Sequence, residues 1–256
     1  MAASPSSRRA IDEPDASVTS LYKPKLVVAY GRGGSGKSTG IRYFVERAQN
    51  SGREPVIADA DPRATLGGYF SGVLKPTHSE EIVVTDWLDA LVNAQAETPT
   101  TVVLDRNGGD QIFGRFAASL GLIDLLTSVA IMPVALHFLG TDLDDVADLQ
   151  RAEDSGAFCP EATVLILNAG TIKDARPADV AFAGVREHPA YRAAIARGAR
   201  EIVLPKLPCM AAVNALRGPF ASAETDKRLG ITDRQRVAMW RRAVEEALLP
   251  VAAWMP

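Results

Sequence analysis

The sequence predicts an α/β fold with a mostly parallel sheet flanked by helices on both faces. Short apolar runs bounded by turn residues alternate with helical patterns from about residue 25 to the C-terminus. Parallel strands need helical crossovers, and these cover both faces of the sheet, so the strands themselves are almost continuously apolar. A glycine-rich turn also joins the first apolar run directly to a helical pattern.

Six apolar runs give the expected strands, which cover residues 25–30, 55–59, 101–105, 130–138, 163–168 and 201–204. Helices are expected near residues 37–50, 85–96, 111–126, 142–152, 179–197, 209–217 and 232–249. In the last helix Thr232 and Gln235 form a capping-box pattern, which predicts Thr232 as the N-cap. The apolar tail after that helix, residues 248–256, is expected to dock on the core.

Length and composition favour one large domain over residues 23–256. With 47% hydrophobic and 23% charged residues in a chain of 256, a substantial core can form. Residues 1–22 are rich in Ser, Ala and charge without any period, which predicts a disordered N-terminal leader. A formal net charge of −3 argues against a generally basic nucleic-acid binder but leaves room for a local basic face.

Several classes of site and location are not favoured. Cys159 and Cys209 lie far apart and have no zinc-ligand spacing, so both are expected to be buried hydrophobes. His137 lies inside an apolar run and is expected to be a satisfied core residue. No stretch reaches the ~18 apolar residues of a membrane span, and the start lacks a signal-peptide core, so a cytoplasmic location is expected.

The glycine-rich turn has the pattern of a phosphate-binding loop. The segment Gly31–Ser38 reads G-x-x-x-x-G-K-S between an apolar strand and a helix. Small residues let successive backbone N–H groups approach phosphate oxygens, and the helix N-terminus adds partial positive charge. Lys37 is expected to reach the β and γ phosphates, and the Ser38 hydroxyl to bind Mg²⁺. The expected phosphate-contacting residues are Gly33, Gly34, Ser35, Gly36, Lys37, Ser38 and Thr39.

Carboxylates follow the second and third strands, where the carboxyl ends of a parallel sheet converge on a ligand. Asp59 and Asp61 lie in a D-x-D-P segment, with Asp61 expected to orient an attacking water and Asp59 to support Mg²⁺ or the loop. Because Asp and Pro also favour turns, this segment has a second reading as a plain turn. Asp105 ends four apolar residues in the manner of a Walker B strand and is expected to hold Mg²⁺.

Together the segments Arg32–Thr39, Asp59–Pro62 and Val103–Asp105 resemble the ParA/MinD superfamily of deviant Walker A P-loop ATPases. The resemblance implies the P-loop NTPase architecture, ATP and Mg²⁺ as cofactors, and slow Mg²⁺-dependent ATP hydrolysis. In that family a lysine at the position of Arg32 reaches across an ATP-bound homodimer to the partner's phosphates. Arginine keeps the charge but differs in length and geometry, so Arg32 is the candidate for this role.

The resemblance extends to the base. Asn168, at the end of a buried strand, matches an asparagine that hydrogen-bonds adenine in the family, although Asn in such a place is otherwise a common turn former. Pro205 and Lys206 resemble the turn that walls the base. The segment 105–110, Asp-Arg-Asn-Gly-Gly-Asp, resembles the switch of the conjugation and mobilisation (TraL- and MobD-like) branch.

Membership would imply a switch in which ATP closes a dimer that binds DNA or a protein, as in plasmid partition or conjugative transfer. The implied protein partner is ParB-like, a relaxase or a transfer protein. A candidate DNA surface is the basic set on the last helix, Arg234, Arg236, Arg241 and Arg242. A solvated helix face accounts equally well for these arginines.

Two other functions fit the same motifs. An ATP-dependent metabolic enzyme, such as a synthetase or small-molecule kinase, can use the same fold, with a substrate pocket near residues 63–84 or 106–120. A nucleotide-responsive scaffold with little turnover is the other. Of the three, the ATP-dependent switch is the leading interpretation of the sequence.

Overall fold

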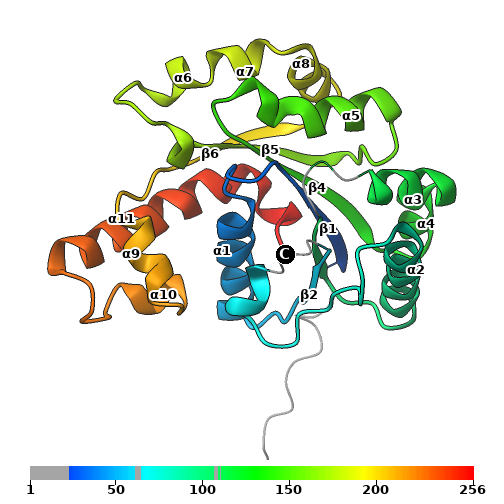
Figure 1. The fold of residues 1–256 in the computed structure, drawn as a ribbon, viewed down its shortest axis with the longest axis horizontal. Coiled ribbons are helices and arrows are strands. Elements are labelled where there is room, and N and C mark those ends of the chain that lie inside the picture. Colours follow the sequence, from blue (N-terminus) through cyan, green and yellow to red (C-terminus); the bar gives the residue numbers. More distant parts are fainter. Residues whose placement is uncertain (1–22, 61–64, 107–108, 110) are drawn as a thin grey trace, which may run out of the picture.

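The structure, a computed structural model, describes residues 23–60, 65–106, 109 and 111–256. Its centre is a six-stranded sheet with all strands parallel, in the order β2-β3-β1-β4-β5-β6 (Figure 1). The strands are β1 (Lys25–Tyr30), β2 (Val56–Asp59), β3 (Val102–Asp105), β4 (Met132–Leu139), β5 (Ala162–Asn168) and β6 (Arg200–Leu204). The predicted α/β fold is confirmed, with the glycine-rich loop between β1 and the first helix.

Helices connect the strands and cover both faces of the sheet. The α-helices are α1 (Lys37–Asn50), α2 (Glu81–Glu97), α3 (Ile112–Leu120), α4 (Leu122–Ser128), α5 (Ala147–Ser155), α6 (Ala178–Ala181), α7 (Ala183–Glu187), α8 (Pro189–Ala196), α9 (Met210–Ala215), α10 (Phe220–Ala223) and α11 (Ile231–Leu248). Short 3₁₀ helices are η2 (Thr65–Gly68), η3 (Leu143–Val146), η4 (Ala169–Thr171) and η5 (Leu249–Trp254).

The core divides into layers because successive strand residues point to opposite faces. On one face Val27 and Ala29 of β1 pack with α1, α9, α10 and α11. On the other, Leu26, Val28 and Tyr30 pack with α2, α3 and α4, while α5 to α8 cover the β5 side of that face (Figure 1). This burial of both faces explains why the strands read as continuous apolar runs.

Two predicted helices are wrong in extent. The one expected near 111–126 is broken at Gly121, whose left-handed φ of 56° ends α3 before α4 begins. The one expected at 179–197 is three short helices. His188 precedes Pro189 and adopts an extended ψ of 135°, as the residue before proline tends to do, and this separates α7 from α8.

The start of the last helix also differs from the prediction. Its N-cap is Gly230, and no side chain caps it, so Thr232 lies inside the first turn and the predicted capping box does not form. The tail expected to dock on the core does so. Val251 and Met255 are buried in the layer that contains α1, and Arg53 donates a hydrogen bond of 2.7 Å to the carbonyl of Pro256.

Among the helices that the structure describes, none is long and apolar enough to cross a membrane. The predicted leader, residues 1–22, lies outside the described residues.

Candidate functional site

The glycine-rich loop runs from the end of β1 to the start of α1, at the carboxyl end of the sheet. Gly34 and Gly36 have φ values of 93° and 91°, which only glycine adopts without strain. Gly36 is also the N-cap of α1, and a Cβ there would lie 2.0 Å from Nδ2 of Asn168. The loop therefore needs glycine here for both backbone conformation and space. The N–H groups that begin α1 are aimed out of the helix, where an anion is favoured.

Lys37, the first residue of α1, is buried beneath this loop. Its Nζ donates hydrogen bonds to the carboxylate of Asp105 and, at 2.7 Å, to the carbonyl of Arg106. Strand pairing explains the geometry, because Asp105 lies beside Ala29 at the end of β3, next to the strand that leads into the loop. Phosphate binding by Lys37 would exchange this ion pair for one with phosphate oxygens.

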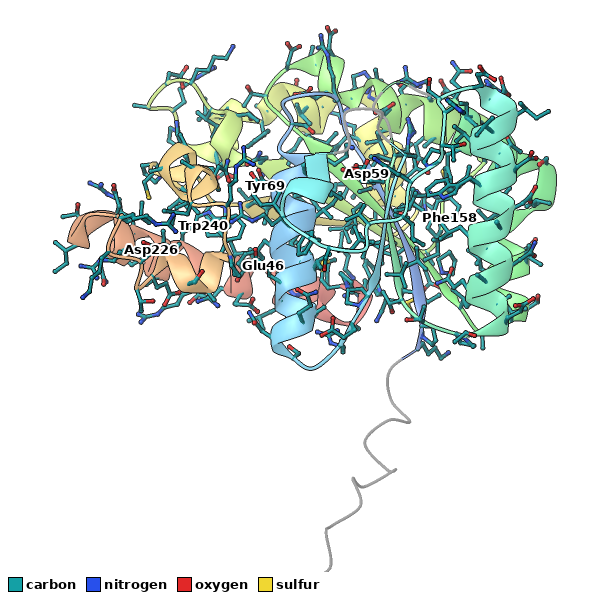
Figure 2. The ribbon with its side chains drawn as sticks, turned by 60° about the horizontal axis from the view of Figure 1, so that its bottom comes forward. Glu46, Asp59, Tyr69, Phe158, Asp226 and Trp240 are labelled. Atoms are coloured by element: carbon teal, nitrogen blue, oxygen red, sulfur yellow. The ribbon has the colours of Figure 1, made fainter. Side chains whose placement is uncertain are left out.

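Asp59 and Asp105 lie side by side, since they are register partners on β2 and β3. Both are 0% exposed. Figure 2 shows Asp59 toward the end of α1 that follows the loop. These two carboxylates and the hydroxyl of Ser38, half-buried at the start of α1, are hard oxygen donors of the kind that Mg²⁺ prefers. No cluster of three or more His, Cys, Asp or Glu side chains able to hold a metal occurs within the described ranges.

Part of the predicted site cannot be located. Asp61 and its neighbours 62–64 lie outside the described residues, as do residues 107, 108 and 110 of the segment that follows Asp105. The predicted roles of Asp61 and of that segment therefore stay predictions.

A cavity of about 410 Å³ opens beside the loop, between α1 and α11. It collects Asn168, Pro205 and Lys206, the three residues predicted to contact the base, with Gly34, Gly36 and Thr39 of the loop. Trp240 and Tyr43 add aromatic walls that the sequence did not assign to the site. Trp240 recurs at helical spacing with Val237 and Val244, a pattern that indicates a buried helix face but not what else lies there.

Asn168 does more in this cavity than line it. Its Nδ2 donates to the carbonyl of Ser35 at 2.8 Å, and its Oδ1 accepts from the N–H of Gly170 at 2.9 Å. The side-chain amide thus ties the end of β5 to the glycine-rich loop, and one N–H and one lone pair remain for a ligand. Lys206 Nζ donates to the carbonyl of Ile172 at 2.7 Å, and Trp240 Nε1 to that of Pro205 at 2.7 Å.

Arg32 lies at the rim, where its guanidinium pairs with Asp144 of η3 at 3.0 Å. The side chains are 54% and 73% exposed, so the pair contributes little to stability, and Arg32 can leave it at small cost. Sequence reasoning missed Asp144. The acidic run Asp142-Leu143-Asp144-Asp145, which begins three residues after the end of β4, was the available signal.

The arginines of α11 are partly neutralised. Arg236 pairs with Asp233 at 2.5 Å, and Arg241 pairs with Glu224. Arg242 is exposed and Arg234 is half-buried. The basic face is therefore weaker than the sequence suggests, because acids from the same helix and from the segment after α10 lie against it.

Comparison with known proteins gives distant likenesses. No protein-family model matches the chain. Dynein axonemal heavy chain 17 of Mus musculus is 27% identical over 167 residues, which are 62% of this chain but only 3% of that protein. The chain thus spans a very small part of the curated relatives it matches.

Among solved structures, a complex of Cyanothece McdA with ATP is 15% identical with a TM-score of 0.48, covering 88% of this chain and 97% of that one. Aquifex aeolicus MinD is 13% identical with a TM-score of 0.44, covering 86% and 97%. Chloroplast FtsY from Physcomitrella patens is 16% identical with a TM-score of 0.42, covering 71% of this chain and 58% of that one. None of these likenesses assigns a family, and the site has to be understood from its own residues.

Proposed function

We propose that this protein is an ATP-binding and ATP-hydrolysing dimerisation switch of the ParA/MinD type. One observation carries the proposal. Lys37 begins α1 directly after a glycine-rich loop, faces the strand-end carboxylate of Asp105, and lies beside a cavity of about 410 Å³ that is large enough for a base. Phosphate, metal and base subsites of a nucleotide thus have candidate residues on adjoining elements.

Each subsite has its own chemistry. The loop residues Gly33–Thr39 supply N–H groups for phosphate oxygens, and Lys37 adds a buried charge. Ser38, Asp59 and Asp105 are the residues that would hold Mg²⁺, which neutralises developing phosphate charge when bound. The base would lie against Pro205 and Lys206. Asp61 is proposed to orient the attacking water.

Dimer closure is assigned to Arg32. At the exposed rim it can exchange Asp144 for the phosphates bound by a second copy of the chain. Arginine suits this contact because its planar fork can hold two phosphate oxygens. The cost of leaving Asp144 is small, since an exposed ion pair is worth at most about 1 kcal/mol.

The output of the switch is a further part of the proposal. In the ATP-bound dimer the exposed Arg242 and its neighbours on α11 would be doubled, which favours binding to the DNA backbone without reading sequence. We propose plasmid partition or conjugative transfer as the setting, with a ParB-like, relaxase or transfer protein as partner. Binding of plain duplex DNA that rises with ATP and falls steeply with salt would support this.

Nucleotide binding is tested first, with a fluorescent ATP analogue and Mg²⁺. We expect Lys37→Ala to weaken binding by about 10- to 100-fold, the worth of one charge-assisted contact. The matched control is Lys23→Ala, an exposed lysine just before β1 and so at the end of that strand opposite to the loop, which should bind as the wild type does. Equal affinity of the two variants would reject the phosphate site.

Dimerisation is tested next, by light scattering with ATP. We expect Arg32→Ala to bind ATP normally but to remain monomeric, and Asp144→Asn, which only frees Arg32, to keep the ATP-dependent dimer. A monomer that releases ADP only with a small-molecule substrate would instead identify a metabolic enzyme. Nucleotide binding with no dimer and no turnover would also reject the switch.

A further inference from the structure

Arg106, the first residue after β3, connects the two faces of the sheet. Its carbonyl accepts the 2.7 Å hydrogen bond of Lys37, whereas its side chain lines a cavity between α3 and α5 on the opposite face. Asp105, one residue earlier, directs its carboxylate to Lys37, and successive residues of an extended chain point to opposite faces. The position of the Arg106 side chain can therefore affect Lys37 through the backbone of a single residue.

The guanidinium of Arg106 belongs to a buried row of side chains that crosses neighbouring strands. His137 of β4 and Tyr30 of β1 are register partners, and their rings are stacked with centres 4.5 Å apart. The Arg106 guanidinium lies 4.6 Å from the centre of the Tyr30 ring. All three residues are 6% exposed or less. The row thus places the guanidinium against the end of β1, the strand that leads into the glycine-rich loop.

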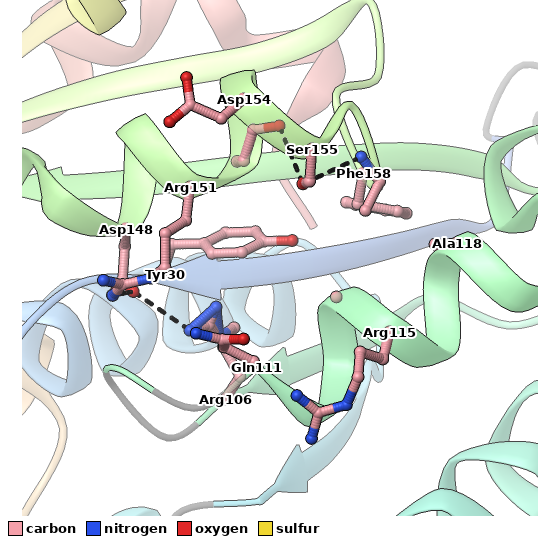
Figure 3. Close-up of a pocket in the computed structure, with 13 residues that line it drawn as sticks. Tyr30, Arg106, Gln111, Arg115, Ala118, Asp148, Arg151, Asp154, Ser155 and Phe158 are labelled. Atoms are coloured by element: carbon pink, nitrogen blue, oxygen red, sulfur yellow. Dashed lines mark hydrogen bonds and ion pairs between the residues drawn. The ribbon is translucent and has the colours of Figure 1, made fainter.

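Asp148 of α5 binds this guanidinium. Nη2 of Arg106 lies 3.2 Å from Oδ1 of Asp148, and the two side chains are only 8% and 5% exposed (Figure 3). Arg151 contacts the same carboxylate oxygen, but its side chain is 42% exposed. A buried charge that loses its partner is costly, whereas an exposed one is not. Asp148 therefore restrains Arg106 more strongly than it restrains Arg151.

The cavity explains why Arg106 needs this restraint. It has a volume of about 420 Å³ and is lined by Arg106 together with Tyr30 and Asp148. In a close-packed interior the neighbours alone fix a side chain, but a long side chain beside an open space has other rotamers available. The ion pair with Asp148 favours one of these rotamers.

We propose that Asp148 is a positioning residue of the nucleotide site and that it acts through Arg106 on Lys37. This inference rests on the proposed function. An ammonium group has three N–H donors. When phosphate replaces the Asp105 carboxylate, the neutral Arg106 carbonyl keeps one donor and leaves the other two for phosphate oxygens. The regular ladder of β3 ends at Asp105, and beyond it the anchored Arg106 side chain restrains the direction of that carbonyl.

The test is a double-mutant cycle of Asp148→Asn with Lys37→Ala, in which the affinity for methylanthraniloyl-ATP is measured with Mg²⁺. We expect Asp148→Asn alone to weaken binding by about 3- to 10-fold, the usual coupling between residues of one network. In the Lys37→Ala background the same change should have less than about a twofold effect, because the group on which it acts is gone. A purely structural role would weaken binding equally in both backgrounds.

Two controls separate the path through Arg106 from other effects on α5. Asp154→Asn is the same substitution on the same helix, at an exposed residue that also lines the cavity, and it should bind as the wild type does. Arg151→Met removes the other cation that contacts Asp148 and should also leave the affinity unchanged.

A second variant covers the case in which Asp148→Asn does not fold, since that change leaves a buried arginine without its ion pair. Arg106→Met combined with Asp148→Leu removes both charges, and an apolar pair is often tolerated in place of a buried ion pair. This variant lacks the ion pair as well, so it should show the same loss of affinity, again absent in the Lys37→Ala background. Circular dichroism checks that each variant folds.

The outcomes distinguish this inference from the proposed function. Wild-type or higher affinity in Asp148→Asn or in the apolar pair, equal losses in both Lys37 backgrounds, or an equal loss in either control each overturns the positioning role and leaves the nucleotide site standing. If the wild-type chain binds no ATP, the proposed function fails, and the positioning role fails with it.

Discussion

His137, on β4, shows how burial sets the charge of a single residue in this sheet. It was expected to be a satisfied core residue, and the burial is confirmed, at 2% exposed. The expectation that its ring nitrogens are hydrogen-bonded is wrong, because Nδ1 of His137 has no hydrogen-bond partner among the described residues. The pKa of His137 is lowered to about 3, mainly because burial disfavours the charged imidazolium. The positive charges of Arg106 and Arg197 lower the pKa further, whereas the negative charge of Asp148 raises it.

A depressed histidine pKa makes the protein sensitive to acid. Below about pH 6.5 the unfolded chain takes up a proton at His137 that the folded chain refuses until about pH 3, so stability falls as the pH drops through this window. We expect this residue alone to cost about 2 kcal/mol at pH 5 relative to pH 7. Urea unfolding of His137→Phe should lack that loss.

The control is His78→Phe, which changes an exposed histidine before α2 and should retain the wild-type loss between pH 7 and pH 5. Identical pH profiles for the wild type and His137→Phe would show that His137 takes up its proton equally in both states.

At the scale of elements, α1 lies very close to β4. A Cβ on Gly40 would lie 2.2 Å from Cε1 of Phe138, whose ring is fully buried and packs on Phe44 at 6.1 Å. The missing side chain lets the helix that carries the phosphate loop approach the sheet. Gly114 of α3 is the opposite case, because a Cβ added to this helical glycine would have no other atom within 4 Å.

These two glycines give a matched comparison. We expect Gly40→Ala to lower the free energy of unfolding by about 1–2 kcal/mol, because overpacking outweighs the gain in helix propensity. Gly114→Ala should raise it by about 0.5 kcal/mol, since it only removes backbone freedom. Denaturant unfolding measures both, and stabilisation by Gly40→Ala would mean that the Phe138 ring moves aside freely.

Helices, strands and loops could be predicted where the residues that determine them are contiguous in the sequence. The strands appear within two residues of their expected bounds, because a doubly covered strand must be apolar throughout. The glycine-rich loop and Asp105 were equally readable, since motif and strand end are contiguous in sequence. The break at Gly121 was missed because a single glycine inside an apolar helical pattern is consistent with either a continuous or a divided helix.

At the scale of the whole molecule, the C-terminal segment closes the layer that contains α1. Val251 and Met255 belong to the same buried cluster as Val27 and Ala29 of the central strand. Asp144 and Trp240 enter the site in the same way, from elements remote in sequence. Residues of this kind could not be assigned from the sequence, because their role depends on which chain segments the fold brings together.

The tail therefore contributes to global stability. We expect Met255→Ala to cost about 2–5 kcal/mol, as large-to-small changes in a core do. Leu249→Ala, six residues earlier at a position that is 72% exposed, should stay within about 0.5 kcal/mol of the wild type. Thermal unfolding of the pair measures the difference, and equal midpoints would show that the segment is detached in solution.

The bond from Asn168 to the carbonyl of Ser35 has a kinetic consequence. A loop fastened to β5 before a ligand arrives has little conformational entropy left to lose on binding. Capture of a triphosphate should then proceed as a single encounter step at a rate proportional to ligand concentration, without a slow ordering phase. Through Asn168, strand β5 would keep the glycine-rich loop in one conformation before the ligand binds.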